Sequence, residues 1–378
     1  MPKAALDYLI IGPAYPFRGG IAETQHQLAL ALQNKGKRVE LVTFTKLYPK
    51  IIFPGKTQLS QESAPDGLII KSLLHAYNPL KWSQVLNYIK SKSPRVVVFR
   101  YYTPFLALAY AGIAKKLPDG IKKIALVDNW IPHEKRRFDK KLNALLAKQM
   151  DAFTSLSPFV AKQIEKNFTG PVWAGFHPIN RNLCTKIPQQ KAKSILSWDA
   201  DVAYVLFFGL IRKYKGLELL IQAFDSPMLK KKNIKLYVAG ECYENENKYI
   251  HLIESLELQN QIVLDFNFKN NSQIQQLFSA ASLVAQTYHT ATQSGVTPLA
   301  YCYEKPLLVS DIEGLRTPIE KDQTGLVVKK KPEAIAAGII KLLEKQEYNR
   351  FEKNIKKASE KYSWKSYSDQ WDEFVSNS

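Results

Sequence analysis

The sequence predicts an α/β fold in which two doubly wound parallel sheets face each other across a cleft. Along both halves of the chain, short apolar runs alternate with stretches whose apolar residues recur at helical spacing. This alternation indicates parallel strands covered by helices on both faces. The length of 378 residues suits two domains of ordinary size, each with its own core.

In the first half, the apolar runs are typical of strands and the segments between them of helices. The predicted strands are Tyr8–Gly12, Val39–Phe44, Val96–Phe99, Ile124–Val127 and Phe153–Ser155. The predicted helices are Ile21–Asn34, Trp82–Ser91, Pro104–Lys115, Asp139–Met150 and Pro158–Asn167. The irregular, Lys-rich region from Pro171 to Lys193 then fits a linker between domains.

The second half repeats the scheme, so we expect two Rossmann-like domains. A helical pattern from Tyr348 to Phe374, broken near Ser363, ends the chain. The predicted strands of this half lie near Tyr204–Phe208, Lys235–Ala239, Ile262–Leu264, Leu283–Ala285, Leu307–Val309 and Gly325–Val328.

The composition is that of a folded protein, with 46% hydrophobic residues. The first residues lack the pattern of a secretory signal. The longest apolar run, Phe105 to Ala114, is far shorter than the roughly 20 residues that cross a bilayer. Cys184, Cys242 and Cys302 are widely scattered, which indicates neither a disulfide framework nor a zinc cluster. We therefore expect a cytoplasmic protein.

Positive charge is concentrated in the first half of the chain. The net charge is +19, and residues 1–180 hold 26 Lys and Arg against 11 Asp and Glu, whereas the rest hold 27 against 23. Such a surface is most often only solvated, but it also attracts nucleic acid, anionic lipid headgroups or acidic glycans. The densest basic cluster consists of Lys115, Lys116, Lys122, Lys123, Lys135, Arg136, Arg137, Lys140 and Lys141.

A first phosphate-binding signal follows the predicted strand at 204–208. The strand ends at Gly209, and Arg212 and Lys215 then stand in a tight loop before a helical pattern. An Arg binds a phosphate through two donors, and a Lys supplies a compact charge. The pair therefore suits a diphosphate, although basic residues before a helix are often only a solvated loop.

A second signal is the stretch from Ala291 to Gly295, a loop of small polar residues before a short apolar run and a buried strand at Leu307–Ser310. A loop rich in Gly, Ser and Thr at a helix start presents free backbone N–H groups to a phosphate. An ordinary strand-to-helix turn is the alternative. Two such loops in one half of the chain favour a diphosphate site.

Four stretches resemble, in this order, the GT-B glycosyltransferases of the retaining family 4 type (glycosyl transferases group 1). They are GPAYPFRGGIAETQHQLALAL, FFGLIRKYKGLELLIQAF, YVAGE and ATQSGV. The resemblance implies an acceptor-side domain at 1–178 and a domain for the nucleotide-sugar donor at 179–361. It also implies a C-terminal helix, about 362–378, that packs back onto the first domain, where Trp364, Tyr367, Trp371 and Phe374 would bury the contact. A helix that packs on its own domain is the alternative.

The resemblance assigns roles to residues at the carboxyl ends of predicted strands, where doubly wound sheets bind ligands. His133 is the expected catalytic residue beside the transferred sugar, with Asp128 as the second choice; His26 and His177 have no assigned place. Gln293 and Glu241 are expected to contact the sugar and nucleoside of the donor. The expected diphosphate contacts are Gly19, Gly20, Gly209, Arg212, Lys215, Ser294, Gly295, Val296 and Thr297.

One departure from the family concerns its paired glutamates, which contact the donor. Alignment on Pro306 puts Ala291 and Leu299 at their places. The ATQSGV stretch therefore replaces the pair, and Gln293 is a chemically sensible substitute because an amide both donates and accepts hydrogen bonds.

The predicted reaction moves a sugar from a nucleoside diphosphate-sugar to a glycan or lipid-linked acceptor, with retention of configuration, in cell-surface polysaccharide synthesis. We expect no metal and no cofactor besides the donor, and peripheral attachment to the anionic inner leaflet through the basic cluster. A non-catalytic nucleotide- or glycan-binding protein and a sugar-nucleotide epimerase are the alternatives. Nucleic acid is not an expected partner, since no recognised module is visible.

Overall fold

The computed structural model describes residues 6–48, 59–60, 63–132, 137–179 and 184–378. The chain divides into two compact units. Unit 1 comprises Met1–Pro178 with Trp364–Ser378, and unit 2 comprises Ile179–Ser363. In the part of the chain that the structure describes, no helix is long and apolar enough to cross a membrane.

Unit 1 is built on a seven-stranded sheet in the order β3-β2-β1-β4-β5-β6-β7, in which every neighbouring pair is parallel. The order reverses between β1 and β4, which makes their carboxyl ends a topological switch point. The strands are β1 (Tyr8–Ile11), β2 (Val39–Lys46), β3 (Ile69–His75), β4 (Val96–Tyr101), β5 (Lys122–Val127), β6 (Ala152–Ser155) and β7 (Val172–Ala174).

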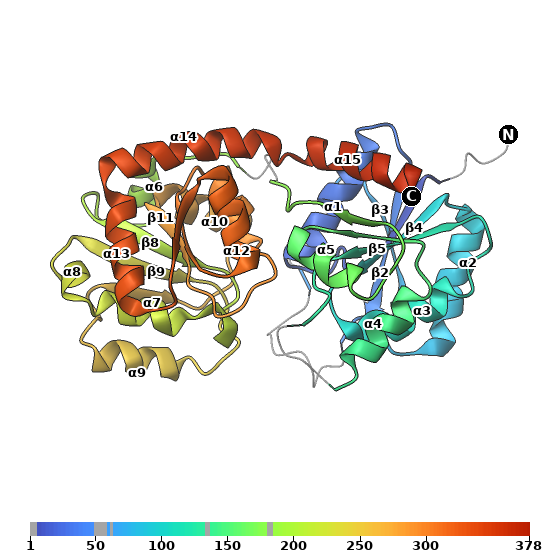
Figure 1. The fold of residues 1–378 in the computed structure, drawn as a ribbon, viewed down its shortest axis with the longest axis horizontal. Helices are drawn as coiled ribbons and strands as arrows, with labels where there is room; N and C mark the ends of the chain where they lie inside the picture. The colour runs from blue at the N-terminus through green and yellow to red at the C-terminus, as the bar shows by residue number, and fades with distance from the viewer. Residues whose placement is uncertain (1–5, 49–58, 61–62, 133–136, 180–183) are drawn as a thin grey trace. The chain divides into compact units, whose positions relative to one another are not determined.

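Helices cover both faces of this sheet (Figure 1). The central strands β1 and β4 are buried throughout, as their continuous apolar runs require. The helical elements are α1 (Gly20–Gln33), η1 (Pro79–Lys81), α2 (Trp82–Lys92), η2 (Pro104–Leu106), α3 (Ala107–Ala114), α4 (Asp139–Ala147), α5 (Pro158–Glu165) and α15 (Trp364–Asn377).

The last helix, α15, is part of unit 1 and packs beside α1. Tyr367 and Trp371 are fully buried, and the Trp371 indole donates to Thr154 Oγ1 on β6 at 3.2 Å. The Tyr8 hydroxyl on β1 donates to the carboxylate of Asp372. The aromatic residues of α15 therefore bury its contact with the first sheet.

Unit 2 is built on a six-stranded parallel sheet in the order β10-β9-β8-β11-β12-β13. Its strands are β8 (Ala203–Phe208), β9 (Ile234–Ala239), β10 (Ile262–Asp265), β11 (Leu283–Gln286), β12 (Leu307–Ser310) and β13 (Gly325–Val328). Its helices are α6 (Gln189–Ile195), η4 (Lys213–Lys215), α7 (Leu217–Phe224), α8 (Pro227–Lys230), α9 (Asn247–Ser255), α10 (Asn271–Ala280), α11 (Val296–Cys302), α12 (Glu313–Asp322), α13 (Pro332–Leu343) and α14 (Lys345–Lys361).

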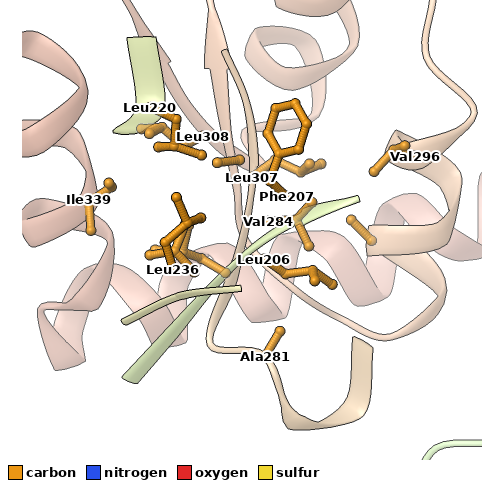
Figure 2. Close-up of a cluster of buried hydrophobic side chains, with 14 of the residues drawn as sticks. Leu206, Phe207, Leu220, Leu236, Ala281, Val284, Val296, Leu307, Leu308 and Ile339 are labelled. Carbon is orange, nitrogen blue, oxygen red and sulfur yellow. The ribbon is translucent and has the colours of Figure 1, made fainter. Parts of the chain in front are cut away.

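The core of unit 2 joins the sheet to its helices. In Figure 2, Leu308 of β12 points to the side of the sheet on which Leu220 of α7 and Ile339 of α13 lie. Val284 of β11 points to the opposite side, on which Val296 of α11 lies. The switch point here lies between β8 and β11. Packing on both faces fixes the carboxyl ends of these two strands, from which the candidate site is built.

The predicted α/β class with two doubly wound parallel sheets is confirmed, and all the predicted strands are present. Two strands escaped prediction: β3, whose outer half is largely exposed, and β7. The region from Pro171 to Lys193 is not simply a linker, because it contains β7 and the start of α6. The helix predicted at Asp139–Met150 ends at Ala147, and the bounds given above replace the predicted ones elsewhere.

The cysteine prediction was wrong, because Cys184 and Cys302 form a disulfide within unit 2. Their Cα atoms lie 5.3 Å apart although 118 residues separate them in sequence, a distance typical of disulfides. The chain after Cys184 packs along α10, where the Gln189 side chain donates to the carbonyls of Ala280 and Ala281. That packing brings Cys184 to the end of α11, which sequence spacing does not reveal.

Candidate functional site

The loop after β8 is shaped by two glycines with positive φ. Gly209 has φ 99° and Gly240, after β9, has φ 135°, values that L side chains rarely adopt. The Gly209 N–H donates to the Ala239 carbonyl at 2.9 Å. A Cβ at Gly240 would lie 2.8 Å from the Gly209 carbonyl carbon. Both glycines are therefore needed for the two strand ends to come this close.

Lys215 ends the η4 turn of this loop, and its side chain points inward. The residue is 7% exposed, and its Nζ lies 5.4 Å from the centroid of the Tyr288 ring. A Cβ at Gly209 would lie 2.9 Å from Nζ, so the ammonium sits over that glycine. Among the residues that the structure describes, none accepts a hydrogen bond from Nζ or forms an ion pair with it. The site therefore holds a buried cation whose counter-charge is not supplied by those residues.

Two effects lower the pKa of the Lys215 ammonium to about 8. The larger is burial, which disfavours the charged form, and the second is the nearby positive charge of Arg212. Arg212 is half-buried at the start of η4. An anion bound between these side chains would reverse both effects, because it would offset the desolvation and the repulsion together.

The loop between β11 and α11 lies against the same place. The Val296 side chain comes 3.7 Å from the Cβ position of Gly209, and the Ser294 hydroxyl lies 3.4 Å from the Tyr288 hydroxyl. Ser294 Oγ accepts from the Val296 N–H at 3.2 Å, and the Thr297 hydroxyl hydrogen-bonds the Gln286 amide. The structure thus brings the two predicted phosphate loops together.

A second set of contacts holds these loops, and sequence reasoning missed it. The Thr287 hydroxyl donates to the Gly216 carbonyl at 2.9 Å, and the His289 N–H donates to the Tyr214 carbonyl at 2.7 Å. The His289 imidazole pairs with the Glu218 carboxylate in the first turn of α7. The only sequence signal for this set was that Tyr288 and His289 lie close before ATQSGV, with Thr290 between His289 and that stretch.

The remaining predicted residues of unit 2 occupy the edges of this region. Glu241 and Gln293 are half-buried, and the Glu241 carbonyl accepts from the Ile211 N–H at 2.8 Å. Ala291 is buried and Leu299 half-buried, so no carboxylate stands at the two places where the resembling family has glutamates. Gly295 is exposed immediately before α11.

In unit 1, the glycines after β1 remain accessible. Gly19 has φ 109° and caps α1, and a Cβ built on Gly19 or Gly20 meets nothing within 4 Å among the described atoms. Both residues therefore present backbone to open space. His133 lies outside the described residues.

Asp128 is buried and forms a bidentate ion pair with Arg100. Its two carboxylate oxygens accept from Arg100 Nε and Nη2, each at 2.6 Å, and both residues are at most 5% exposed. Arg100 Nη2 also donates to Thr24 Oγ1 on α1 at 3.0 Å. The carboxylate is thus held rigidly at the carboxyl end of β5, a geometry suited to positioning the chain that follows it.

Comparison with known families finds a likeness for unit 2. Residues 188–360, almost all of unit 2, match the family model described as glycosyl transferases group 1. Most of unit 2 is therefore similar to the glycosyl transferases group 1. The candidate phosphate loops, from Gly209 to Gly216 and from Ala291 to Thr297, lie inside the matched residues. No curated protein matches the chain.

Solved structures extend the likeness to both units. Sucrose-phosphate synthase from Thermosynechococcus elongatus has a TM-score of 0.77 at 14% identity, and a glycosyltransferase from Rickettsia africae has 0.75 at 17%, each covering 98% of both chains. HepE from Anabaena in complex with UDP has 0.73 at 16%, covering 99% of this chain and 100% of that one. The chain thus has a GT-B fold, and the residues that match the family model lie in its second half.

Proposed function

We propose that this protein transfers a sugar from a nucleoside diphosphate-sugar to a hydroxyl group of a glycan or lipid-linked glycan. The observation that carries the proposal is the buried Lys215 ammonium, which has no acidic partner among the described residues and stands over Gly209 beside Arg212. A diphosphate would supply the missing negative charge. The group 1 family match covers this loop and supports the same reaction class.

In this proposal, Lys215 and Arg212 stabilise the negative charge that develops on the leaving diphosphate. Fixed charges act most strongly in a site from which water is excluded, and Lys215 is already desolvated. Backbone N–H groups near Ser294 to Thr297 would bind further phosphate oxygens. The resemblance also assigns Gly19 and Gly20 to the diphosphate. We propose that these groups suffice without a metal ion or another cofactor.

The finer assignments follow from the resemblance stated above. We propose that transfer retains the anomeric configuration, with the leaving phosphate taking the proton of the attacking hydroxyl. His133 would hydrogen-bond the transferred sugar, and Asp128 would hold the chain leading to it. Gln293 and Glu241 would contact the sugar and the nucleoside of the donor in place of the family's glutamate pair.

The solved relatives suggest which donor to test first. HepE from Anabaena has been solved with UDP and with UDP-glucose, and WaaG is a glycosyltransferase involved in lipopolysaccharide biosynthesis. We therefore propose a uridine diphosphate-sugar as donor and a cell-surface polysaccharide as product. We further propose that the chain works in the cytoplasm, at the inner leaflet of the membrane. This proposal rests on the positive charge of residues 1–180 and not on the cysteines, because Cys184 and Cys302 form a disulfide.

A thermal-shift panel of UDP, ADP, GDP and their glucose conjugates tests the donor. A ligand that binds only the folded form raises the melting temperature, so at least one diphosphate should do so, and the matching nucleoside should not. Failure of every nucleotide to shift the melting temperature would refute the proposal.

A non-catalytic nucleotide-binding protein is the second candidate, because Ala291 and Leu299 replace the family's glutamates. The two candidates differ in turnover. Slow hydrolysis of the donor, followed by release of the nucleotide, is expected of the transferase even without an acceptor. Tight binding with no hydrolysis and no transfer to any cell-surface glycan extract would favour the binding protein.

A further inference from the structure

Aromatic side chains gather at the carboxyl ends of three strands of unit 1. Tyr48 follows β2, His75 ends β3, Tyr77 lies just beyond it, and Phe105 lies in η2 after β4. The ring centroids are 4.5 Å apart for His75 and Tyr77, 6.4 Å for Tyr77 and Phe105, and 5.5 Å for Tyr48 and Phe105. These four residues, which we call the aromatic platform, therefore form one continuous chain of ring contacts.

The aromatic platform is not an ordinary part of the core. Tyr77 is 43% exposed, and Tyr48 and Phe105 are half-buried, so ring surface faces solvent. The platform also stands at the edge of the sheet where doubly wound folds bind their ligands. Exposed aromatic surface in such a place is typical of a binding site.

Polar groups accompany the rings. His75 is 8% exposed, and its Nδ1 is buried with no hydrogen-bond partner in the part of the chain that the structure describes. Its backbone carbonyl accepts from the Trp82 indole at 2.9 Å, which fixes the residue in place. The platform thus holds an imidazole nitrogen whose partner those residues do not supply.

Two lysines add positive charge beside the histidine. Lys46, at the end of β2, and Lys81, in η1, are both exposed, and neither forms an ion pair with another described residue. Burial, then the charge of Lys81, then that of Lys46, lower the pKa of His75. The imidazole is therefore neutral at pH 7, and the lysines are the cations available to a ligand.

We propose that the aromatic platform is a subsite for a sugar ring that carries a negative charge, and that this ring belongs to the acceptor. The C–H face of a pyranose would pack on the rings of Tyr77 and Phe105, whose electron-rich faces attract it. A carboxylate or phosphate on the sugar would pair with Lys46 and Lys81. The assignment to an acceptor rests on the proposed function, because a transferase needs a second sugar site besides that of the donor.

Binding of simple sugars to the full chain tests the subsite without any nucleotide. Methyl β-glucuronide, glucose 6-phosphate and neutral methyl β-glucoside are compared by saturation-transfer NMR and titration. Comparing the glucuronide with glucose 6-phosphate shows whether the subsite prefers a carboxylate or a phosphate. The variants are Tyr77→Ala, Tyr77→Phe and the double variant Lys46→Ala/Lys81→Ala, with Leu80→Ala and Lys90→Ala as controls at exposed neighbouring positions.

We expect at least one anionic probe to bind more tightly than methyl β-glucoside. Tyr77→Ala should abolish its saturation transfer, whereas Tyr77→Phe, which keeps the ring, should retain it. The double lysine variant should bind the anionic probe about fivefold more weakly, and its affinity for the glucoside should not change. The two control variants should bind all probes as the wild-type protein does. Equal binding of charged and neutral probes, no binding of any probe, or no effect of Tyr77→Ala would overturn the proposal.

The same samples separate this proposal from the proposed function. If UDP or another diphosphate still raises the melting temperature while all sugar probes fail, the subsite is wrong and the donor site stands. If the acidic sugar binds through Tyr77 and no nucleotide binds, the platform is a glycan site of a protein that is not a nucleotide-sugar transferase.

Discussion

At the scale of single residues, Lys215 is unusual because its charge is buried before any ligand arrives. A lysine normally places its ammonium in water while its stem covers apolar surface, but here Nζ lies over Gly209 beside the Tyr288 ring. Its neighbour Lys213 occupies the same turn and is exposed. The two lysines therefore form a matched pair that differs mainly in burial.

We expect Lys215→Ala to weaken binding of the nucleoside diphosphate about tenfold to a hundredfold, because hydrogen bonds to charged groups are among the stronger ones. Lys213→Ala should change it little. Isothermal titration calorimetry, with the nucleotide found by the thermal-shift panel, measures the affinity of both variants. Equal effects of the two substitutions would show that the turn contributes only general positive charge.

The pKa of Lys215, about 8, predicts how binding depends on pH. Below pH 8 the ammonium is charged and binds the diphosphate, whereas above pH 8 the free protein loses this proton. The dissociation constant should therefore rise about tenfold between pH 7 and pH 9, and Lys215→Ala should abolish this rise. A pH-independent constant in the unchanged chain would contradict the assignment.

Raising the pH has the opposite effect on the stability of the free protein from its effect on nucleotide binding. Because the pKa of Lys215 is lowered from 10.5, the buried charge destabilises the free protein below pH 8, and this cost disappears as pH rises from 8 toward 10.5. Lys215→Ala removes the cost, so the variant should melt no lower than the unchanged chain at pH 7. That expectation separates a binding defect from a folding defect.

Asp128 illustrates a residue whose first effect is on stability. Asp128→Asn would leave the guanidinium of Arg100 buried without its ion-pair partner, which costs about 3–5 kcal/mol of unfolding free energy. Asp369→Asn breaks a contact of 3.2 Å with Lys35 at a carboxylate that is 51% exposed, and should cost less than about 1 kcal/mol. Urea unfolding of both variants makes the comparison, and similar losses would contradict it.

At the scale of elements, α15 contributes to unit 1 although it is far from that unit in sequence. Trp371→Ala should destabilise the protein by about 3–5 kcal/mol, because the indole is fully buried and bonded to Thr154. Glu373→Ala, on the exposed face of the same helix, should change the unfolding free energy by less than about 0.5 kcal/mol. Unfolding that is unaffected by Trp371→Ala would mean that α15 is not an integral part of unit 1.

The disulfide between Cys184 and Cys302 ties the chain before α6 to the end of α11. Of the three cysteines, only Cys242 is free. A thiol reagent in denaturant should therefore label one cysteine in the protein as isolated and three after reduction. Three labelled thiols before reduction would show that the bond does not form.

Strands and loops that depend on local sequence pattern could be predicted, whereas contacts between residues far apart in sequence could not. The strands of unit 2 and the loop from Gly209 to Lys215 could be read from local pattern, because each depends on residues close in sequence. β3 escaped because its outer residues are exposed, so the apolar signal is diluted. The pairing of His289 with Glu218 and that of Arg100 with Asp128 depend on strand order, which periodicity does not encode.

At the scale of the whole molecule, binding to an anionic membrane could depend on where the positive charge lies or only on the total net charge. The net charge of +19 by itself attracts any anionic surface, but the excess of Lys and Arg in residues 1–180 predicts that unit 1 makes the contact. The exposed Lys140 and Lys141 lie on α4 of unit 1, and the exposed Lys356 and Lys357 lie on α14 of unit 2. Each adjacent pair carries the same charge on a helix.

Flotation with vesicles distinguishes these possibilities. The unchanged chain should float with vesicles containing anionic lipid and not with neutral ones, and it should dissociate at high salt because screening shortens the Debye length to about 3 Å at 1 M. Lys140→Gln/Lys141→Gln should weaken this binding, since each lysine near the surface contributes about 1 kcal/mol, whereas Lys356→Gln/Lys357→Gln should not. Equal losses would mean that total charge governs the attraction, and no preference for anionic vesicles would remove the membrane from the proposed function while leaving the diphosphate site on unit 2 untouched.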